Sequence, residues 1–95
     1  MAKNSIILTS SAIQALVSHP LSKSENMVLW LLVSNMPASG MVVSHADLAN
    51  KLKLTRPSVS QIMKRLCEIG FLVRGPKIGV SHHYKINPVF IRILN

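Results

Sequence analysis

The sequence has very few acidic residues. Its 95 residues include 11 Lys and Arg but only three acids, Glu25, Asp47 and Glu68, which gives a net charge of +8. These carboxylates are far apart in the chain, and no glycine-rich phosphate loop or Ser–His–Asp grouping accompanies them. We therefore expect no enzyme activity and no cofactor.

Cysteine and long apolar runs are also scarce. Cys67 is the only cysteine, which excludes an internal disulfide and is typical of a reducing cytoplasm. The longest apolar run, residues 27–33, is far shorter than the roughly 20 residues that cross a bilayer. The start, "MAKNSIILTSSAIQ", has no small-residue cleavage site. We expect a cytoplasmic protein with no signal peptide and no membrane partner.

The histidines and the cysteine do not suggest a metal site. His82 and His83 are adjacent on an expected strand, so they point to opposite faces and cannot bind one ion together. A site would need His19, His45 or Cys67 nearby as well. Cys67 borders an apolar helix face, which favours a buried, inert thiol, whereas a redox sensor needs an exposed thiol with a lowered pKa. One histidine of the pair could still contact phosphate.

The positive charge is concentrated in the second half of the chain. Residues 1–50 carry two Lys and two acids, whereas residues 51–95 carry nine Lys and Arg against Glu68 alone. A basic field of this kind suits a phosphate backbone. A basic surface kept for solubility is the alternative, but such surfaces usually include acids as well.

Capping signals and apolar spacing predict four helices. The first covers 10–18, and the second covers 23–36 after a capping box of Ser22 and Glu25. The third and fourth cover 45–53 and 55–69; Ser44 caps the third, and Thr55 caps the fourth. Residues 27–33 are apolar on all sides, so the second helix is expected to be buried on most of them.

The C-terminal part predicts a hairpin. "FLVRG" at 71–75 and "VSHHYKI" at 80–86 have the composition of strands, and "PKIG" at 76–79 has that of a turn. With 95 residues and 48% hydrophobic content, the chain is sufficient for one core. We expect residues 1–95 to be a single domain of the α+β class, mainly helical.

The fourth helix has two distinct sides. Its apolar side contains Val59, Ile62, Met63, Leu66 and Ile69. The opposite side contains Pro57, Gln61 and Lys64, flanked by Ser58, Ser60 and Arg65. Gln and Ser bind base edges in a major groove, and Lys and Arg bind phosphate or guanine. An ordinary amphipathic helix is the alternative for this helix taken alone.

The segment "DLANKLKLTRPSVSQIMKRLCEIGFLVR" resembles the helix-turn-helix of winged-helix DNA-binding proteins, a group that includes MarR-like repressors. Leu48 and Ala49 in the first helix, Leu54 in the turn and Thr55 as the cap carry the resemblance. A small residue such as Ala49 allows two crossing helices to approach closely. The resemblance implies a helix-turn-helix at about 45–69 and a wing at about 71–86.

The turn of this motif departs from the family pattern. Lys53 occupies the position that is usually glycine, and a positive φ is costly for a residue with a side chain. Either the turn is altered, or Lys53 accepts the strain and adds a phosphate contact.

A second resemblance concerns plasmid proteins. "LSKSENMVLWLLVSNM" and "HHYKINPVFIRIL" are similar to segments of RepL-type plasmid replication proteins, and the similarity covers about residues 21–94. It implies plasmid or phage DNA as the setting more strongly than it implies replication initiation.

Together these features predict a protein that binds double-stranded DNA with sequence preference, most simply a transcriptional repressor. A plasmid replication or partition protein is an alternative, and a winged-helix module that binds protein or RNA is another. The residues expected to contact DNA are Ser44, Lys53, Thr55, Arg56, Ser58, Ser60, Gln61, Lys64, Arg65, Arg74 and Lys77.

We also expect a homodimer, because one winged helix reads only one short half-site. The apolar ends, 5–17 and 89–94, are the candidate pairing segments. The alternative is that these ends close the core of the monomer.

Overall fold

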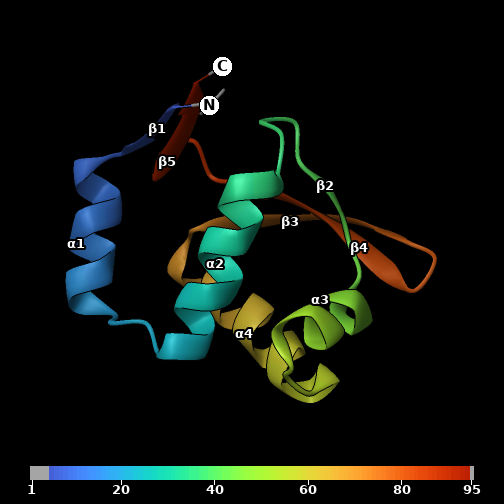
Figure 1. Ribbon diagram of the computed structural model, residues 1–95. Helices are drawn as coiled ribbons and strands as arrows, with labels where there is room; N and C mark the ends of the chain where they lie inside the picture. Colours follow the sequence, from blue (N-terminus) through green and yellow to red (C-terminus); the bar gives the residue numbers. More distant parts are fainter. Residues whose placement is uncertain (1–4, 95) are drawn as a thin grey trace.

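The computed structural model describes residues 5–94, which form four helices and five strands (Figure 1). The helices are α1 (Ser10–Ser18), α2 (Lys23–Asn35), α3 (His45–Leu52) and α4 (Arg56–Ile69). The strands are β1 (Ser5–Leu8), β2 (Met41–Val43), β3 (Leu72–Ile78), β4 (Ser81–Ile86) and β5 (Ile91–Leu94). All four helices lie where the sequence predicts them, to within a residue at most ends.

The predicted caps are present at the helix starts. The Ser22 hydroxyl accepts a hydrogen bond from the Glu25 N–H, and the Glu25 carboxylate accepts one from the Ser22 N–H at 2.8 Å. Ser44 and Thr55 each accept from the backbone N–H three residues later. A side-chain oxygen at this position satisfies an N–H that the helix itself leaves unpaired. The capping signals therefore fix where α2, α3 and α4 begin.

Helix α2 lies in the middle of the molecule, with α1 on one side and α3 and α4 on the other (Figure 1). Its buried residues pack in one core with the apolar side of α4 and with residues from the sheet. The buried residues of α2 are Val28, Leu29, Leu32 and Val33, and those of α4 are Val59, Ile62, Met63 and Leu66. The burial expected for both helices is confirmed.

The hairpin is present, but its turn lies later than predicted. Strands β2, β4 and β3 form an antiparallel sheet in that order, and β3 continues through Gly75 and Pro76. The turn is Gly79 and Val80, so the prediction of a turn at 76–79 was wrong. A bulge between Arg74 and Lys77 explains the difference. Pro76 cannot donate to a ladder, and an edge strand with a bulge tolerates it.

The two ends of the described chain pair with each other. Strands β1 and β5 form a separate antiparallel ribbon in which Ile6 is opposite Ile93 and Leu8 is opposite Ile91. The Thr9 N–H donates to the Phe90 carbonyl at 3.0 Å, which extends the connection into α1. The sequence identified these segments as apolar but did not predict that they are strands, since each is only four residues long.

Lys53 adopts the left-handed conformation that glycine would favour. Its φ is 58° and its ψ is 42°, and among the described residues no other non-glycine residue has a positive φ. The Leu54 N–H donates to the Ala49 carbonyl at 2.9 Å, which closes the turn between α3 and α4. The helix-turn-helix geometry is therefore kept, and Lys53 carries the strain.

Replacing Lys53 with glycine should stabilise the fold. We expect Lys53→Gly to raise the free energy of unfolding by about 0.5–1 kcal/mol, because it removes left-handed strain at the cost of some unfolded-state entropy. Denaturant unfolding monitored by circular dichroism measures this change.

The matched control is Lys51→Gly, in the last turn of α3. It should lower the free energy of unfolding by up to about 1 kcal/mol, because glycine is a poor helix former. If both variants destabilise the protein equally, Lys53 carries no special strain.

Candidate nucleic-acid interface

Helix α4, the second helix of the helix-turn-helix, has one side exposed to solvent. Ala49 is buried in α3, at the position where the sequence predicts a small residue for a close crossing, and Val59, Ile62, Met63 and Leu66 bury the inner side of α4. The exposed side of α4 then carries Ser58, Ser60, Gln61 and Lys64. Arg56 lies at its first position, next to the cap Thr55. This is the side that the sequence predicts for DNA.

The exposed side of α4 has a single acid, Glu68, which lies near the end of the helix. Within residues 5–94, the ion pair between Arg65 and Glu25 is the only one, so Arg56 and Lys64 have no carboxylate partner there. Helix α4 also has no acid in its first turn. Its N-terminus carries the partial positive charge of the helix dipole, which adds to the charge of Arg56. The N-terminal half of α4 is thus a surface suited to phosphate.

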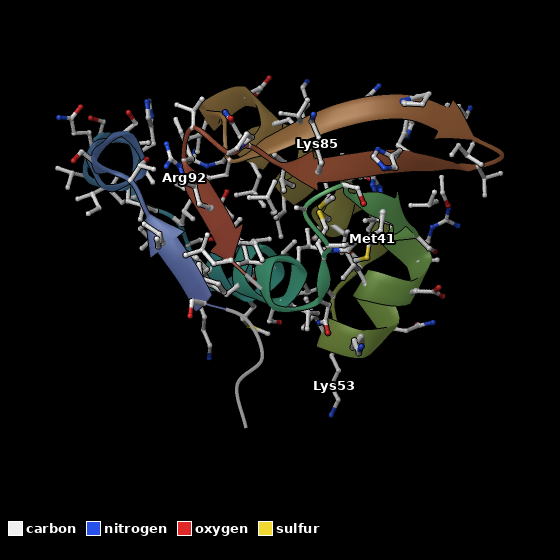
Figure 2. All side chains as sticks on the ribbon, turned by 90° about the horizontal axis from the view of Figure 1, so that it is seen from above. Met41, Lys53, Lys85 and Arg92 are labelled. Carbon is white, nitrogen blue, oxygen red and sulfur yellow. The ribbon has the colours of Figure 1, made fainter. Side chains whose placement is uncertain are left out.

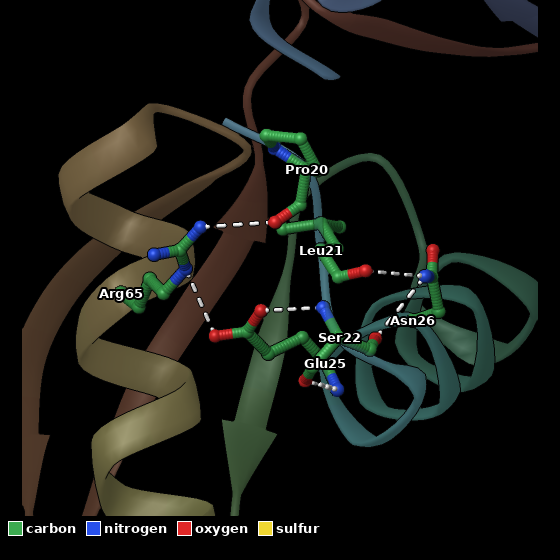
Figure 3. Close-up of polar contacts among 6 residues, drawn as sticks. All are labelled: Pro20, Leu21, Ser22, Glu25, Asn26 and Arg65. Carbon is green, nitrogen blue, oxygen red and sulfur yellow. Dashed lines mark hydrogen bonds and ion pairs between the residues drawn. The ribbon is translucent and has the colours of Figure 1, made fainter. Parts of the chain in front are cut away.

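Arg65 is placed differently from the other expected residues (Figure 3). Its Nε lies 2.9 Å from a Glu25 carboxylate oxygen as an ion pair, without the geometry of a hydrogen bond. Its Nη2 donates to the Pro20 carbonyl at 3.2 Å. The guanidinium therefore joins α4 to the start of α2 through its Nε and Nη2. We leave it out of the proposed interface.

Two further expected residues bind each other at the start of α4. The Thr55 hydroxyl accepts from the Ser58 N–H and donates to the Ser58 hydroxyl at 2.8 Å. Ser44 similarly caps α3. These three side chains therefore stabilise helix ends, and any phosphate would approach them at the N-terminus of a helix.

A cleft separates α4 from the sheet. It has a volume of about 440 Å³ and contains three of the expected residues, Ser60, Lys64 and Arg74. Its other lining residues are His45, Met63, Cys67, Glu68, His82 and Tyr84. The cleft thus brings together cationic side chains from α4 and β3 with two histidines that the sequence did not select as binding residues.

His45, on α3, contacts both α4 and the sheet across this cleft. Its Nδ1 lies 2.9 Å from the Ser60 hydroxyl on α4, and its Nε2 lies 3.2 Å from the Tyr84 hydroxyl on β4. Burial lowers the pKa of His45, and the positive charges of His82, Arg56 and Arg74 lower it further. Both effects favour the neutral form of the ring. No sequence spacing indicates these contacts, because they join residues 15 and 39 positions apart.

Cys67 is half-buried, and the two adjacent histidines lie on opposite faces of the sheet. Burial raises the pKa of the half-buried Cys67 thiol, although nearby Arg74 acts in the opposite direction. A thiol with a raised pKa is a poor nucleophile, which favours an inert role over redox sensing. His82 faces the cleft, whereas His83 lies against Gly40 and Gly75 on the other side of the sheet.

The wing places two basic residues on the side of the sheet that faces the cleft. Arg74 is opposite Tyr84 and Lys77 is opposite His82, and directly opposed side chains share a face. Lys85 is opposite Val73, one position out of phase with Arg74 and Tyr84, and therefore lies on the other face. At the tip, Val80 is 96% exposed.

The positive charge of residues 51–95 is spread over more than one face. Figure 2 shows Lys53 at one end of the molecule beside α3, whereas Lys85 and Arg92 lie at the opposite end. The excess of charge in the second half of the sequence therefore does not correspond to one continuous basic surface. The candidate interface is therefore limited to α4 and the wing and does not include the whole charged half.

Comparison with known proteins agrees with this arrangement. Residues 43–73 match the family model described as winged helix-turn-helix DNA-binding. The match extends from the end of β2 through α3 and α4 to the start of β3. Among curated proteins, no match to the chain was found. The match and the fold together support a winged helix-turn-helix of the DNA-binding kind over this segment.

Proposed function

We propose that the protein is a transcriptional repressor of the cytoplasm that binds duplex DNA at a preferred sequence, with residues 1–95 acting as one winged helix domain. The observation that carries this proposal is the exposed side of α4, where Ser60, Gln61 and Lys64 have no acidic partner among the described residues. A DNA-binding domain with hydrogen-bonding side chains on its recognition helix is equipped to distinguish bases.

The two halves of the interface have different roles. In the proposed complex α4 enters the major groove by its N-terminal half, so that Gln61 and Ser60 contact base edges. Lys53 and Arg56 contact the phosphates beside the groove, and Lys64 contacts either a phosphate or a guanine. Arg74 and Lys77 reach the adjacent backbone or minor groove from the wing. Neither an enzyme activity nor a cofactor is part of this proposal.

A second candidate is a plasmid replication or partition protein. The similarity of residues 21–94 to RepL-type proteins supports it. A footprint on the protein's own upstream region and replicon separates the two roles. One upstream palindrome would favour a repressor, whereas tandem repeats at an origin would favour replication or partition.

We further propose that the protein acts as a homodimer, and that α1 and the β1–β5 ribbon form the pairing surface. These elements expose large apolar side chains, including Ile6, Ile7, Leu8, Ile13, Val17 and Leu94. Ile6 and Leu8 lie on the same face as the buried Ile91, yet they are 45% and 39% exposed. The inner face of β1 therefore extends past the core and lacks a cover in the monomer.

The charge of the protein favours a second copy as the partner. Residues 5–22, which include β1 and α1, contain no Lys, Arg, Asp or Glu, although the chain carries a charge of +8. Two copies can therefore approach through α1 and β1 without bringing charges of the same sign together. Arg92 on β5 is opposite Ile7 and lies on the face of the ribbon away from Ile6 and Leu8. Strand β1 has one free edge, and a lone two-stranded ribbon is only marginally stable. Pairing of β1 with its copy would extend the ribbon to four strands.

The proposed surface leaves the interface with DNA free. Figure 1 shows α1 and the β1–β5 ribbon on one side of the molecule and α3 and α4 on the other side. A two-fold axis beside α1 would therefore place the two α4 helices outward, each available for one half-site.

The first test concerns Gln61. Gln61→Ala should weaken binding to the preferred site by about 1–3 kcal/mol and relax discrimination at one base pair, because it removes a bidentate contact. Gln14→Ala, at an exposed position of α1, is the matched control and should change neither quantity. Equal losses on specific and random duplexes would show that Gln61 does not read a base.

The second test concerns the wing. Lys77→Ala should weaken binding to all duplexes about evenly and reduce the slope of log K against log salt by about one, since one phosphate contact is lost. Lys85→Ala removes the same charge from the opposite face of the sheet and should leave the slope nearly unchanged. An unchanged slope for Lys77→Ala would place the wing away from DNA.

The third test concerns the dimer. Ile13→Glu combined with Val17→Glu should produce a monomer in equilibrium sedimentation at micromolar protein, because both side chains are exposed and a charge would be buried on pairing. Val80→Glu, at the exposed wing tip, should leave the dimer intact. A wild-type protein that is monomeric both free and on DNA, with a single asymmetric footprint, would contradict the proposal.

A further inference from the structure

Ser60 occupies a position on α4 from which it can reach DNA, but its hydroxyl is already bound to another side chain. The Ser60 Oγ lies 2.9 Å from Nδ1 of His45, which belongs to α3. A free serine hydroxyl rotates and serves equally as donor or acceptor, so it distinguishes bases poorly. A hydroxyl that is hydrogen-bonded to a histidine already uses one of these two roles, so the other role is the one left for DNA.

The direction of the hydrogen bonds follows from Tyr84. Its hydroxyl lies 3.2 Å from Nε2 of His45, and within residues 5–94 it has no second partner. Tyr84 is only 2% exposed, so a phenol hydrogen that pointed away from His45 would lose the only acceptor that the described residues offer it. The Tyr84 hydroxyl therefore donates to Nε2. A neutral imidazole that accepts at Nε2 carries its proton on Nδ1 and donates to Ser60 Oγ.

The surroundings keep the ring in this neutral form. The groups that face His45 are His82 and Tyr84 on β4, Arg74 on β3, and Arg56 and Ser60 on α4. Burial and the positive neighbours hold the pKa of His45 below its ordinary value. Glu68 on α4 lines the same cleft, but within residues 5–94 it makes no ion pair with His45.

We infer that His45, held by Tyr84, positions the Ser60 hydroxyl as a hydrogen-bond donor toward DNA. The oxygen accepts from His45, so its hydrogen points away from the ring and toward the groove. The groups it would recognise are acceptors of the major-groove edge, namely N7 of a purine, O6 of guanine or O4 of thymine. An amino group at that position, as on cytosine, offers a donor and is disfavoured. This inference rests on the proposed binding of duplex DNA.

The first measurement is independent of DNA. Nitrogen-15 shifts of the His45 ring in the intact protein distinguish a proton on Nδ1 from one on Nε2. We expect the proton on Nδ1 in the wild type. Tyr84→Phe keeps the ring but removes the hydroxyl, so the proton should move toward Nε2. A wild-type proton on Nε2 would overturn the inference even if the protein binds its preferred site normally.

The second measurement is binding to the preferred duplex and to a random duplex. Ser60→Ala and Tyr84→Phe should each weaken specific binding by about tenfold, the value of one hydrogen bond, and leave random binding unchanged. In the double variant the loss should not increase, because Tyr84 acts only through Ser60. Additive losses would overturn the positioning role.

The matched control is His83→Gln, because His83 follows His82 in the sequence but lies on the other face of the sheet, away from the cleft. It should change neither the specific nor the random affinity. A wild-type protein with no preference among duplexes would instead reject the proposed function, while the nitrogen shifts would still report the hydrogen-bond direction.

Discussion

The packing of α4 against the core determines what the protein can present to DNA. Val59, Ile62, Met63 and Leu66 are buried, and each such side chain contributes about 1.5–3 kcal/mol relative to exposure. Rotating α4 about its axis would expose these residues and bury polar ones, so the orientation of the helix is strongly fixed. Its remaining side carries Ser60, Gln61 and Lys64. The surface for recognition is therefore a direct consequence of the core.

Two polar contacts refine this orientation. At the start of α2, Glu25 takes part in the capping box and in the ion pair with Arg65, so one carboxylate connects α2 with α4. On the opposite side of α4, His45 connects Ser60 with Tyr84 in the sheet. Each of these contacts contributes only a modest free energy alone. Their effect is to hold α4 from both sides, so that its polar side chains keep a constant position relative to the wing.

Much of the fold was predictable from the sequence, because caps and apolar spacing are local signals. Ser22 with Glu25, Thr55 and Gly70 define helix ends through contacts within a few residues. The predicted position of the hairpin turn was wrong. The dipeptide "GP" usually indicates a turn, whereas here Pro76 lies in a bulge of an edge strand. For the candidate site, the sequence predicted which polar residues lie on the exposed side of α4, but it did not predict their contacts. The sequence could not show that Arg65 differs in role from Lys64, since only the folded chain brings Glu25 to Arg65. The contacts of His45 were not predictable because they join residues far apart in the sequence.

The central claim is that the exposed side of α4 binds duplex DNA. The most direct test is the affinity of the intact protein for a duplex, measured at several salt concentrations with the wild type and with Lys64→Glu. We expect log K to fall linearly with log salt, with a slope set by several phosphates. We also expect Lys64→Glu to weaken binding by more than about tenfold, because a contact becomes a repulsion. No affinity for duplex DNA at low salt, or an affinity that Lys64→Glu leaves unchanged, would contradict the claim.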